Sequence, residues 1–380
     1  MFGAAISEHP VTAHAAGEVV GQVLEQVGEA PDLAVLFVSR PHLGLMAEIA
    51  DTVRTALRPA TLLGAASGAV LGGDREVEEG PAISLWAGRV GPVEPVRLQT
   101  QRLDGGWALT GLPTSSAEDP DRVLVLLTDP FSVPADGVLD RLRLKAPGLR
   151  VVGGMAAAAG APGGNRLVLD GEVHEDGAVG ALVDASAVSG TVVSQGCRPI
   201  GRPYVVTAST DNVIHDLAGV PALDRLREVV AGLPEADRDL VQHGLQVGRV
   251  IDEQQDTFGA GDFLIRSLLR ADAEAGDIAI GTSADVGSTV QFQVRDAASA
   301  DAELRHLLAG QRGRAALVFT CNGRGSRLFG EPDHDARLVH EQVGRGAVAG
   351  MSCAGELGPV GGHNFVHGFT ASVVLFDTAP

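Results

Sequence analysis

The chain has 380 residues, of which 48 are Asp or Glu and 29 are Lys or Arg, so its formal net charge is −19 at pH 7. Such an acidic chain repels a phosphate backbone, which argues against nucleic acid as a partner. Hydrophobic residues make up 45% of the chain, far above a disordered composition, and the length suits about two or three domains. The most apolar stretch, residues 60–73, is shorter than the roughly 20 residues of a bilayer span, so we expect no membrane helix.

The cysteines and the N-terminus bear on the compartment. Three cysteines, Cys197, Cys321 and Cys353, form no CxxC pair and are odd in number, which fits a reducing environment. The N-terminus lacks the basic and apolar regions of a secretory signal, so we expect a cytoplasmic protein. The glycine-rich stretch 61–78 lacks both GxxxxGK and any lysine, which excludes a nucleotide P-loop. We expect no cofactor.

The first part of the chain predicts a helix followed by a strand–helix–strand unit. Apolar residues recur at three- and four-residue spacing over 11–27, so residues 1–30 form an N-terminal helix leading into the core. Residues 33–39 form a continuous apolar run, as in a strand buried on both faces. A helix over 43–57, a strand from 61 into a glycine-rich turn, and a strand over 81–88 follow.

This order of elements recurs twice, which makes three copies. We call them copy one (33–88), copy two (from residue 122) and copy three (315–376). Each is predicted to contain a buried first strand, a helix, a parallel second strand, a small-residue turn and an antiparallel return strand. In copy two the elements are 122–130, a helix over 134–145, 149–160 and a hairpin at Asp170-Gly171; in copy three they are 315–323, a helix over 335–343, 347–362 and 369–376.

Between copies two and three the pattern changes. Residues 189–209 predict two strands around a Gly, Cys, Arg and Pro turn, and a helix begins at 220. Further strands over 263–269, 277–281 and 288–294 predict a largely antiparallel sheet. The fold class is therefore α/β with mixed parallel and antiparallel (α+β) sheets flanked by helices, in two domains built from the repeated units and divided near residue 218.

The right-handed crossover of each strand–helix–strand unit places the carboxyl ends of its first and second strands at one edge of the sheet. The carboxyl ends of the first strands are polar, and the ends of the second strands are rich in small residues. These segments are 39–40, 128–129 and 320–322 for the first strands, and 67–68, 153–154 and 352–356 for the second. Because ligands of open α/β sheets bind at the carboxyl edge, we expect the ligand there.

Two strings carry a more specific signal. They are SQGCRPIGRPYVVTAS (194–209), followed by the helix PALDRLREVV (221–230), and GMSCAGELGPVGGHNFVHGFTASVVLF (350–376). Together they resemble the FIST family, the F-box and intracellular signal transduction proteins, over about residues 31–376. GDREVE (73–78) and ISLW (83–86) resemble its bacterial branch.

The resemblance implies a tandem of an N-terminal FIST domain over 31–218 and a C-terminal FIST domain over 219–380. It also implies an intracellular sensory module that binds small ligands such as amino acids, with no set of catalytic residues attached. We expect no F-box before residue 31 and no kinase, cyclase or methyl-accepting segment after Phe376. Any signalling output would then pass through a separate, unidentified protein partner.

Two turns are candidate ligand sites. Arg198, in the Gly-Cys-Arg-Pro turn, could clamp a carboxylate, or it could pair with an acidic residue at the domain interface. The glycine-rich turn 352–362 could cradle an anion with its backbone N–H groups while Glu356 accepts from an ammonium. Alternatively, its glycines only satisfy turn geometry.

The histidines and cysteines near the C-terminus invite two further readings. His363 and His367 have helical metal-site spacing, but flanking glycines argue against a helix, so we predict no metal site and assign His367 and Asn364 to the pocket. Cys353 or Cys321 could act as a nucleophile, or both could pack as small hydrophobic side chains.

The sequence thus favours a small-ligand sensor rather than an enzyme. The alternatives are a cysteine-dependent enzyme that uses Cys353 or Cys321, and a scaffold whose acidic surface docks a partner. Apolar return strands leave a homodimer open. The predicted ligand-binding residues are Ser67, Arg198, Asn322, Ser352, Cys353, Glu356, Asn364 and His367.

Overall fold

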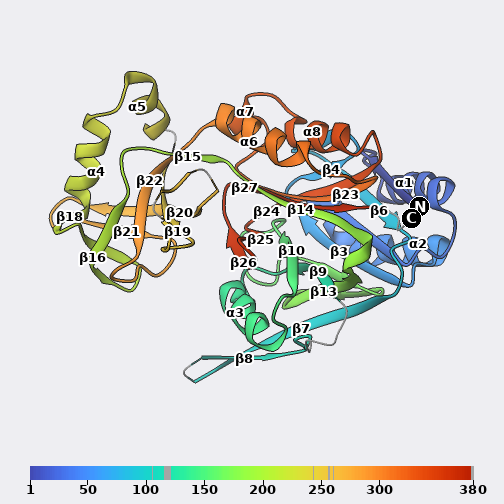
Figure 1. The fold of residues 1–380 in the computed structure, drawn as a ribbon. Coiled ribbons are helices and arrows are strands. Elements are labelled where there is room, and N and C mark those ends of the chain that lie inside the picture. The colour runs from blue at the N-terminus through green and yellow to red at the C-terminus, as the bar shows by residue number, and fades with distance from the viewer. Residues whose placement is uncertain (105, 115–120, 243, 256, 260, 378–380) are drawn as a thin grey trace. The chain divides into compact units, whose positions relative to one another are not determined.

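The computed structural model describes residues 1–104, 106–114, 121–242, 244–255, 257–259 and 261–377 (Figure 1). The chain forms two compact units that interleave along the sequence. We call the first the repeat domain; it holds Met1–Val193, Arg305–Val366 and the segment from Thr370. The second, the barrel domain, holds Ser194–Leu304 and His367–Phe369. The division of the sequence at residues 30 and 218 stays a prediction.

The repeat domain contains the three predicted copies, each with the predicted strand pairing. In every copy the first strand lies between the parallel second strand and the antiparallel return strand. The elements are β2 (Leu33–Ser39), α2 (Met46–Leu57), β3 (Thr61–Ser67) and β6 (Ile83–Gly88); β9 (Arg122–Thr128), α3 (Ala135–Lys145), β10 (Arg150–Met155) and β13 (Ala178–Asp184); and β23 (Ala315–Cys321), α8 (His334–Gln342), β24 (Ala347–Cys353) and β27 (Thr370–Phe376). The mixed fold class is thereby confirmed.

A hairpin leaves each copy and completes the sheet of another copy. Copy one contributes β4 (Val70–Gly72) and β5 (Arg75–Val77), copy two β11 (Leu167–Leu169) and β12 (Glu172–His174), and copy three β25 (Glu356–Val360) and β26 (His363–His367). β4 pairs with β24 of copy three, β11 with β3 of copy one, and β25 with β10 of copy two. The exchange is therefore a closed cycle. Sequence analysis predicted the hairpin at Asp170-Gly171 but not that it joins another copy.

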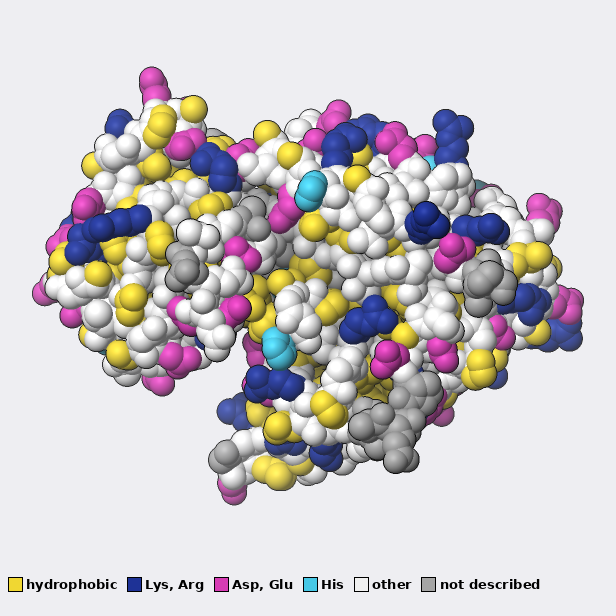
Figure 2. Space-filling view, viewed as in Figure 1, with side chains coloured by type: hydrophobic (Ala, Val, Ile, Leu, Met, Phe, Trp, Pro, Cys, Tyr) yellow, Lys and Arg dark blue, Asp and Glu magenta, His cyan; other side chains and the backbone are white. Residues whose placement is uncertain are grey.

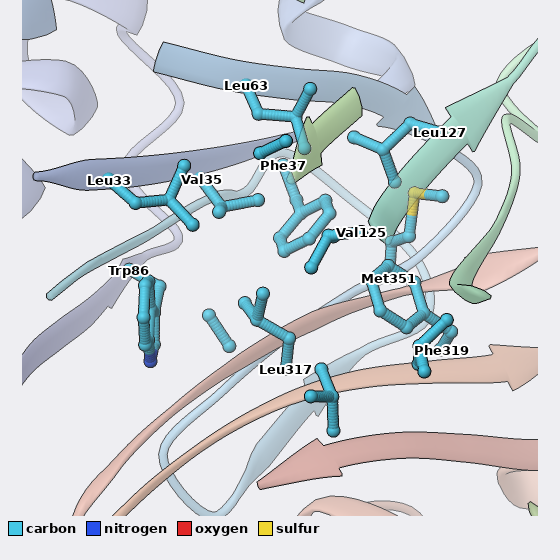
Figure 3. Close-up of a cluster of buried hydrophobic side chains, with 14 of the residues drawn as sticks. Leu33, Val35, Phe37, Leu63, Trp86, Val125, Leu127, Leu317, Phe319 and Met351 are labelled. Carbon is cyan, nitrogen blue, oxygen red and sulfur yellow. The ribbon is translucent and has the colours of Figure 1, made fainter. Parts of the chain in front are cut away.

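The three sheets share one hydrophobic core. Side chains from the inner faces of all three copies point toward one another, among them Phe37, Val125 and Phe319 (Figure 3). On the other face of the copy-one sheet, α1 (Thr12–Val27) and α2 cover a second cluster, and α3 covers the corresponding face of copy two. α1 is the predicted N-terminal helix. The strand before it, β1 (Phe2–Ser7), pairs with β6 and was missed because its pattern is short.

The barrel domain is a closed antiparallel barrel of six strands. Each strand pairs with two others around the ring, in the order β22, β16, β17, β21, β20, β19 and back to β22. The strands are β16 (Tyr204–Thr210), β17 (Val213–Leu217), β19 (Leu245–Val250), β20 (Phe263–Asp272), β21 (Asp277–Ile280) and β22 (Thr289–Arg295). The antiparallel strands predicted from the sequence are present. The sheet's closure and β19 were not predicted.

The remaining elements extend these two domains. They are the 3-10 helices Arg40–Leu45 and Ala185–Ala187, β7 (Val93–Leu103), β8 (Gly106–Thr110), β14 (Val188–Gln195), β15 (Cys197–Pro199), β18 (Val220–Pro221), α4 (Ala222–Ala231), α5 (Glu235–Gln242), α6 (Ala297–Ala309) and α7 (Ser326–Phe329). The helix predicted from residue 43 begins at Met46 because the 3-10 helix precedes it. In the described part of the chain, no helix is long and apolar enough to cross a membrane.

A glycine occupies the same register position in the second strand of each copy. Gly64, Gly153 and Gly350 lie directly opposite Leu36, Leu126 and Val318 of the first strands. A Cβ atom at any of the three would come within 3.0 Å of the partner's carbonyl oxygen. The close approach of first and second strands therefore requires glycine.

We predict that Gly350→Ala lowers the free energy of unfolding by at least about 1–3 kcal/mol, because backbone atoms must shift to admit the methyl group. Gly310→Ala is the matched control, since a Cβ at Gly310 meets nothing within 4 Å. Urea denaturation of both variants measures the effect. Equal stabilities for the two variants would contradict the packing argument.

Candidate functional site

A cavity of about 450 Å³ lies in the repeat domain at the carboxyl ends of β3, β23 and β24. Its walls come from two copies: the exchanged hairpin and Arg40 belong to copy one, and the segment after β23 belongs to copy three. Charged lining residues are Arg40, Arg324, Arg327, Glu76, Glu78 and Glu79; neutral ones include Gly68, Ala69, Thr320, Cys321, Asn322 and Ser352. The position agrees with the ligand edge expected for strand–helix–strand crossovers.

Two serines join the ends of the second strands at the cavity. The Ser67 hydroxyl is fully buried and lies 3.1 Å from the Ser352 hydroxyl. The Ser352 hydroxyl also accepts a hydrogen bond from the Ala69 amide at 3.1 Å. Ser352 lines the cavity, whereas Ser67 fixes Ser352 from behind.

A buried ion-pair network forms one wall. Arg324 and Asp335 have side chains 1% and 0% exposed, and the guanidinium binds the carboxylate through Nε at 2.6 Å and Nη2 at 2.9 Å. Burial opposes the charge of Asp335, but the Arg324 guanidinium and His334 lower its pKa to about 2. The Glu76 carboxylate accepts from the Ala336 amide in the first turn of α8 at 2.8 Å. Burial and the nearby Asp335 carboxylate raise the pKa of Glu76 to about 7.

The other charged side chains that line the cavity differ in whether they have a partner within the protein. The Glu78 carboxylate accepts from the amide of Ser326, at 2.7 Å, and from its hydroxyl, which holds the exchanged hairpin to copy three. Arg40 donates to the Ala157 carbonyl at 3.3 Å. Within the described residues, the side-chain charges of Arg327 and Glu79 have no hydrogen-bond or ion-pair partner, and both residues are exposed. These charges are free to meet a ligand.

Cys353 and Glu356 lie behind the cavity and do not line it. Both are fully buried, and a Cβ at Gly154 would overlap the Cys353 sulfur. Burial, with the Glu356 carboxyl beside it, raises the pKa of the Cys353 thiol well above its usual range. Oε2 of Glu356 accepts from the Thr370 amide and hydroxyl at 3.2 and 2.8 Å, while Oε1 has no partner among the described residues. Burial raises the pKa of Glu356 to about 8, so this carboxyl is mostly neutral at pH 7.

Three of the predicted site residues lie away from the cavity. Arg198 belongs to the barrel domain, where its guanidinium binds Asp237 at 2.7 Å and Asp296 at 2.9 Å. The Asn364 side chain lies on β26, accepts from the Val151 amide at 2.8 Å and donates to the Leu149 carbonyl at 2.6 Å. Through these two bonds Asn364 joins an exchanged hairpin to copy two. His367 is buried and clusters with the barrel domain.

The structure brings Asn322, Ser352 and Cys321 to the cavity, with Ser67 behind them. Sequence reasoning missed the glutamates of the exchanged hairpin and the arginines 324 and 327. No local signal shows that residues 76–79 meet copy three. Arg40 lies in one of the predicted polar strand ends, residues 39–40, and this position could have identified it as a site residue. In the described part of the chain, no three His, Cys, Asp or Glu side chains are grouped so that they could hold a metal ion.

On the face shown in Figure 2, acidic and basic side chains are interspersed rather than segregated. The net charge of −19 is therefore not gathered into one acidic patch on that face. This distribution gives no support there to a docking surface made only of carboxylates.

Comparison with known proteins gives family and relatives. The model of the FIST N domain matches residues 32–220, and that of the FIST C domain matches residues 222–359. A Mycobacterium tuberculosis (strain H37Rv) protein, "Uncharacterized protein Rv0628c", is 43% identical over 386 residues that cover 99% of each chain. A Mycobacterium bovis protein, "Uncharacterized protein Mb0898c", is 43% identical over 384 residues, covering 99% of this chain and 98% of the relative. FIST domains are associated with signal transduction and small-ligand sensing.

We predict that Glu356→Gln becomes more stable relative to the parent protein as the pH rises from 5 to 8. A folded pKa of about 8 exceeds the ordinary value of about 4.3. Over most of that window the unfolded chain is therefore ionised at this position while the folded chain keeps the proton, so parent stability falls with pH until the folded pKa is reached. Glutamine keeps the shape and does not titrate. Melting temperatures at four pH values measure the difference.

The control for this experiment is Glu341→Gln, which changes an exposed carboxyl on α8. Its melting temperature should follow that of the parent at every pH. If Glu356→Gln also follows the parent, the buried carboxyl does not hold its proton as argued.

Proposed function

The chain belongs to the FIST family, and from this premise we propose that it is a sensory protein whose small ligand occupies the cavity of the repeat domain. The observation that carries the proposal is the presence of opposite, uncommitted charges in that one cavity. Arg327 and Glu79 have no internal partner within the described residues, and Arg40 makes a single bond to a carbonyl.

These charges favour amino acids or small carboxylates as ligands. A guanidinium binds a carboxylate through two parallel N–H groups, which gives both strength and orientation. Arg327 and Arg40 are suited to the carboxylate, and Glu79 is suited to an ammonium group. The Asn322 side-chain amide, which has no partner in the described part of the chain, supplies both a donor and an acceptor.

The route to an output rests on which copies the ligand would touch. Arg40 and Glu79 belong to copy one, and Asn322 and Arg327 to copy three. A ligand held by both groups favours the state in which the exchanged hairpin is docked, and a separate protein partner in the cytoplasm reads that state. The same partner would supply the signalling activity.

The runner-up is a cysteine-dependent enzyme. Cys353 is unsuited to that role because its thiol is buried and its pKa is raised, whereas the nucleophile is the thiolate. Cys321 lines the cavity and is the thiol that a bound molecule would meet. A turnover reaction would need Cys321, whereas binding of an amino acid would survive its replacement by serine.

We predict that a thermal-shift screen of amino acids and small carboxylates finds compounds that raise the melting temperature. A ligand at 100 times its dissociation constant adds about 2.7 kcal/mol to the free energy of unfolding. Arg327→Gln should weaken binding of the same compound about 10-fold to 100-fold, since a hydrogen bond to a charged group contributes about 1.5–3 kcal/mol.

Arg312→Gln serves as the matched control, because Arg312 is exposed and does not line the cavity. Its ligand affinity should equal that of the parent protein. Equal affinities for Arg312→Gln and Arg327→Gln would exclude Arg327 as the group that binds the carboxylate. If no compound shifts the melting temperature, the alternative of a scaffold that docks a protein partner is favoured instead.

A further inference from the structure

Two thiols lie side by side at the end of the copy-three sheet. Cys321 on β23 is in register with Cys353 on the parallel strand β24. Cys353 packs in the common core with Phe319 and Met351, whereas Cys321 does not belong to that cluster. Cys353 is fully buried, whereas Cys321 is partly exposed and lines the cavity. A small molecule in the cavity therefore meets only one of the two thiols.

An N–H donor and arginine side chains lie around Cys321. The Gly323 amide donates to Sγ at 3.4 Å. Arg324 lines the same cavity as Cys321, and its guanidinium binds Asp335. Positive charge and N–H donors near a cysteine stabilise the thiolate, which is the attacking species. Arg40 and Arg327 add positive charge on the cavity wall, which also carries the carboxyl groups of Glu76, Glu78 and Glu79.

We infer that Cys321 is a modification site that forms a mixed disulfide with a small disulfide carrying carboxylate groups, held in this cavity. The inference uses the cavity of the proposed function and takes its ligand class one step further. Arg40 and Arg327 bind the carboxylates, and the volume of about 450 Å³ lies within the range of small-molecule sites. The disulfide form of an amino-acid thiol combines these features.

The reaction is a thiol–disulfide exchange. The Cys321 thiolate attacks one sulfur of R–S–S–R, and a Cys321–S–S–R bond forms. The old S–S bond breaks, and its electron pair stays on the departing sulfur. That sulfur takes up the proton released by Cys321 and leaves as R–SH. The small disulfide is the oxidant, and one of its two sulfurs is reduced to a thiol.

The product should persist as a mixed disulfide. Cys353 is the nearest second thiol, but burial keeps it protonated and its sulfur packs against Gly154. A protonated thiol attacks a disulfide slowly, so Cys353 does not displace the bound R–S group. Release then depends on a reductant from solution.

The test treats the full chain with cystine, which carries carboxylates, or with cystamine, which has none, and follows adducts by intact-mass spectrometry and peptide mapping. With cystine, we expect a single cysteine molecule to become joined to Cys321 by a disulfide bond, and a reductant to remove it. The Cys353→Ser and Cys197→Ser variants should react like the parent, whereas Cys321→Ser and Cys321→Ala should not react at that site. Arg327→Gln should slow cystine about 10-fold, and Arg312→Gln should leave the rate unchanged.

The same two disulfides on the chain unfolded in urea give their intrinsic ratio of rates. Relative to that ratio, cystine should be favoured over cystamine in the folded protein. A folded chain that gains no adduct at Cys321, reacts first at Cys353, or shows only the unfolded ratio would overturn the inference.

The proposed function is separated from this inference by the Cys321→Ser variant. If amino acids still raise its melting temperature while the parent fails to form the mixed disulfide, the sensor stands and the modification site falls. If the mixed disulfide forms at Cys321 but no amino acid or carboxylate shifts the melting temperature of either protein, the modification site stands and the sensor falls.

Discussion

The repeat domain depends on the exchange of three hairpins between its copies. A copy alone ends in a second strand whose outer backbone groups have no partner, and such an open edge is costly inside a protein and prone to wrong pairing. β4 covers the edge of β24, β11 that of β3, and β25 that of β10. Each copy donates one hairpin and accepts another, so removal of any one copy would expose two strand edges. The cavity is a product of this exchange, because it lies where the copy-one hairpin meets copy three.

Equivalent positions in copies one and three show that the fold does not require a carboxyl group at position 356. Ser67 and Cys353 end the second strands of copies one and three, and the exchanged hairpins begin three residues later, at Val70 and Glu356. Val70 is a core side chain, as the geometry of the copy would suggest. Glu356 places a carboxyl at the same point, with one oxygen unpartnered in the described structure and a proton retained near neutral pH. Because a valine satisfies the same backbone in copy one, packing does not explain the carboxyl. Departures of this kind from local rules are expected at functional or strained positions.

Local patterns in the sequence were enough to predict the parts of each copy, but not how the copies join. The apolar runs at 33–39, 122–128 and 315–321 identify strands because both faces are buried, and the crossover rule then places their polar ends at one edge. Hairpin exchange pairs residues such as Gly72 and Ala349, which are far apart in sequence and carry no mutual signal. Arg198 shows a second limit: an arginine on a tight turn suits an external carboxylate as well as the Asp237 and Asp296 side chains that hold it here.

Some of the acidic and basic groups around the cavity hold the hairpin in place, and others have no internal partner and remain for a ligand. Glu78 binds Ser326, the Glu76 carboxylate binds the amide of Ala336, and the Glu76 amide donates to Asp333, so three contacts fix copy one to copy three. These groups are satisfied internally and have little to gain from a ligand. Arg327 of copy three and Glu79 of copy one line the same cavity, and their charges have no partner within the described residues. In the proposed function, a molecule that carries both signs of charge would add a further link across the junction. Ligand binding and hairpin docking would then stabilise each other by the same free energy, and this reciprocity is what a sensor requires.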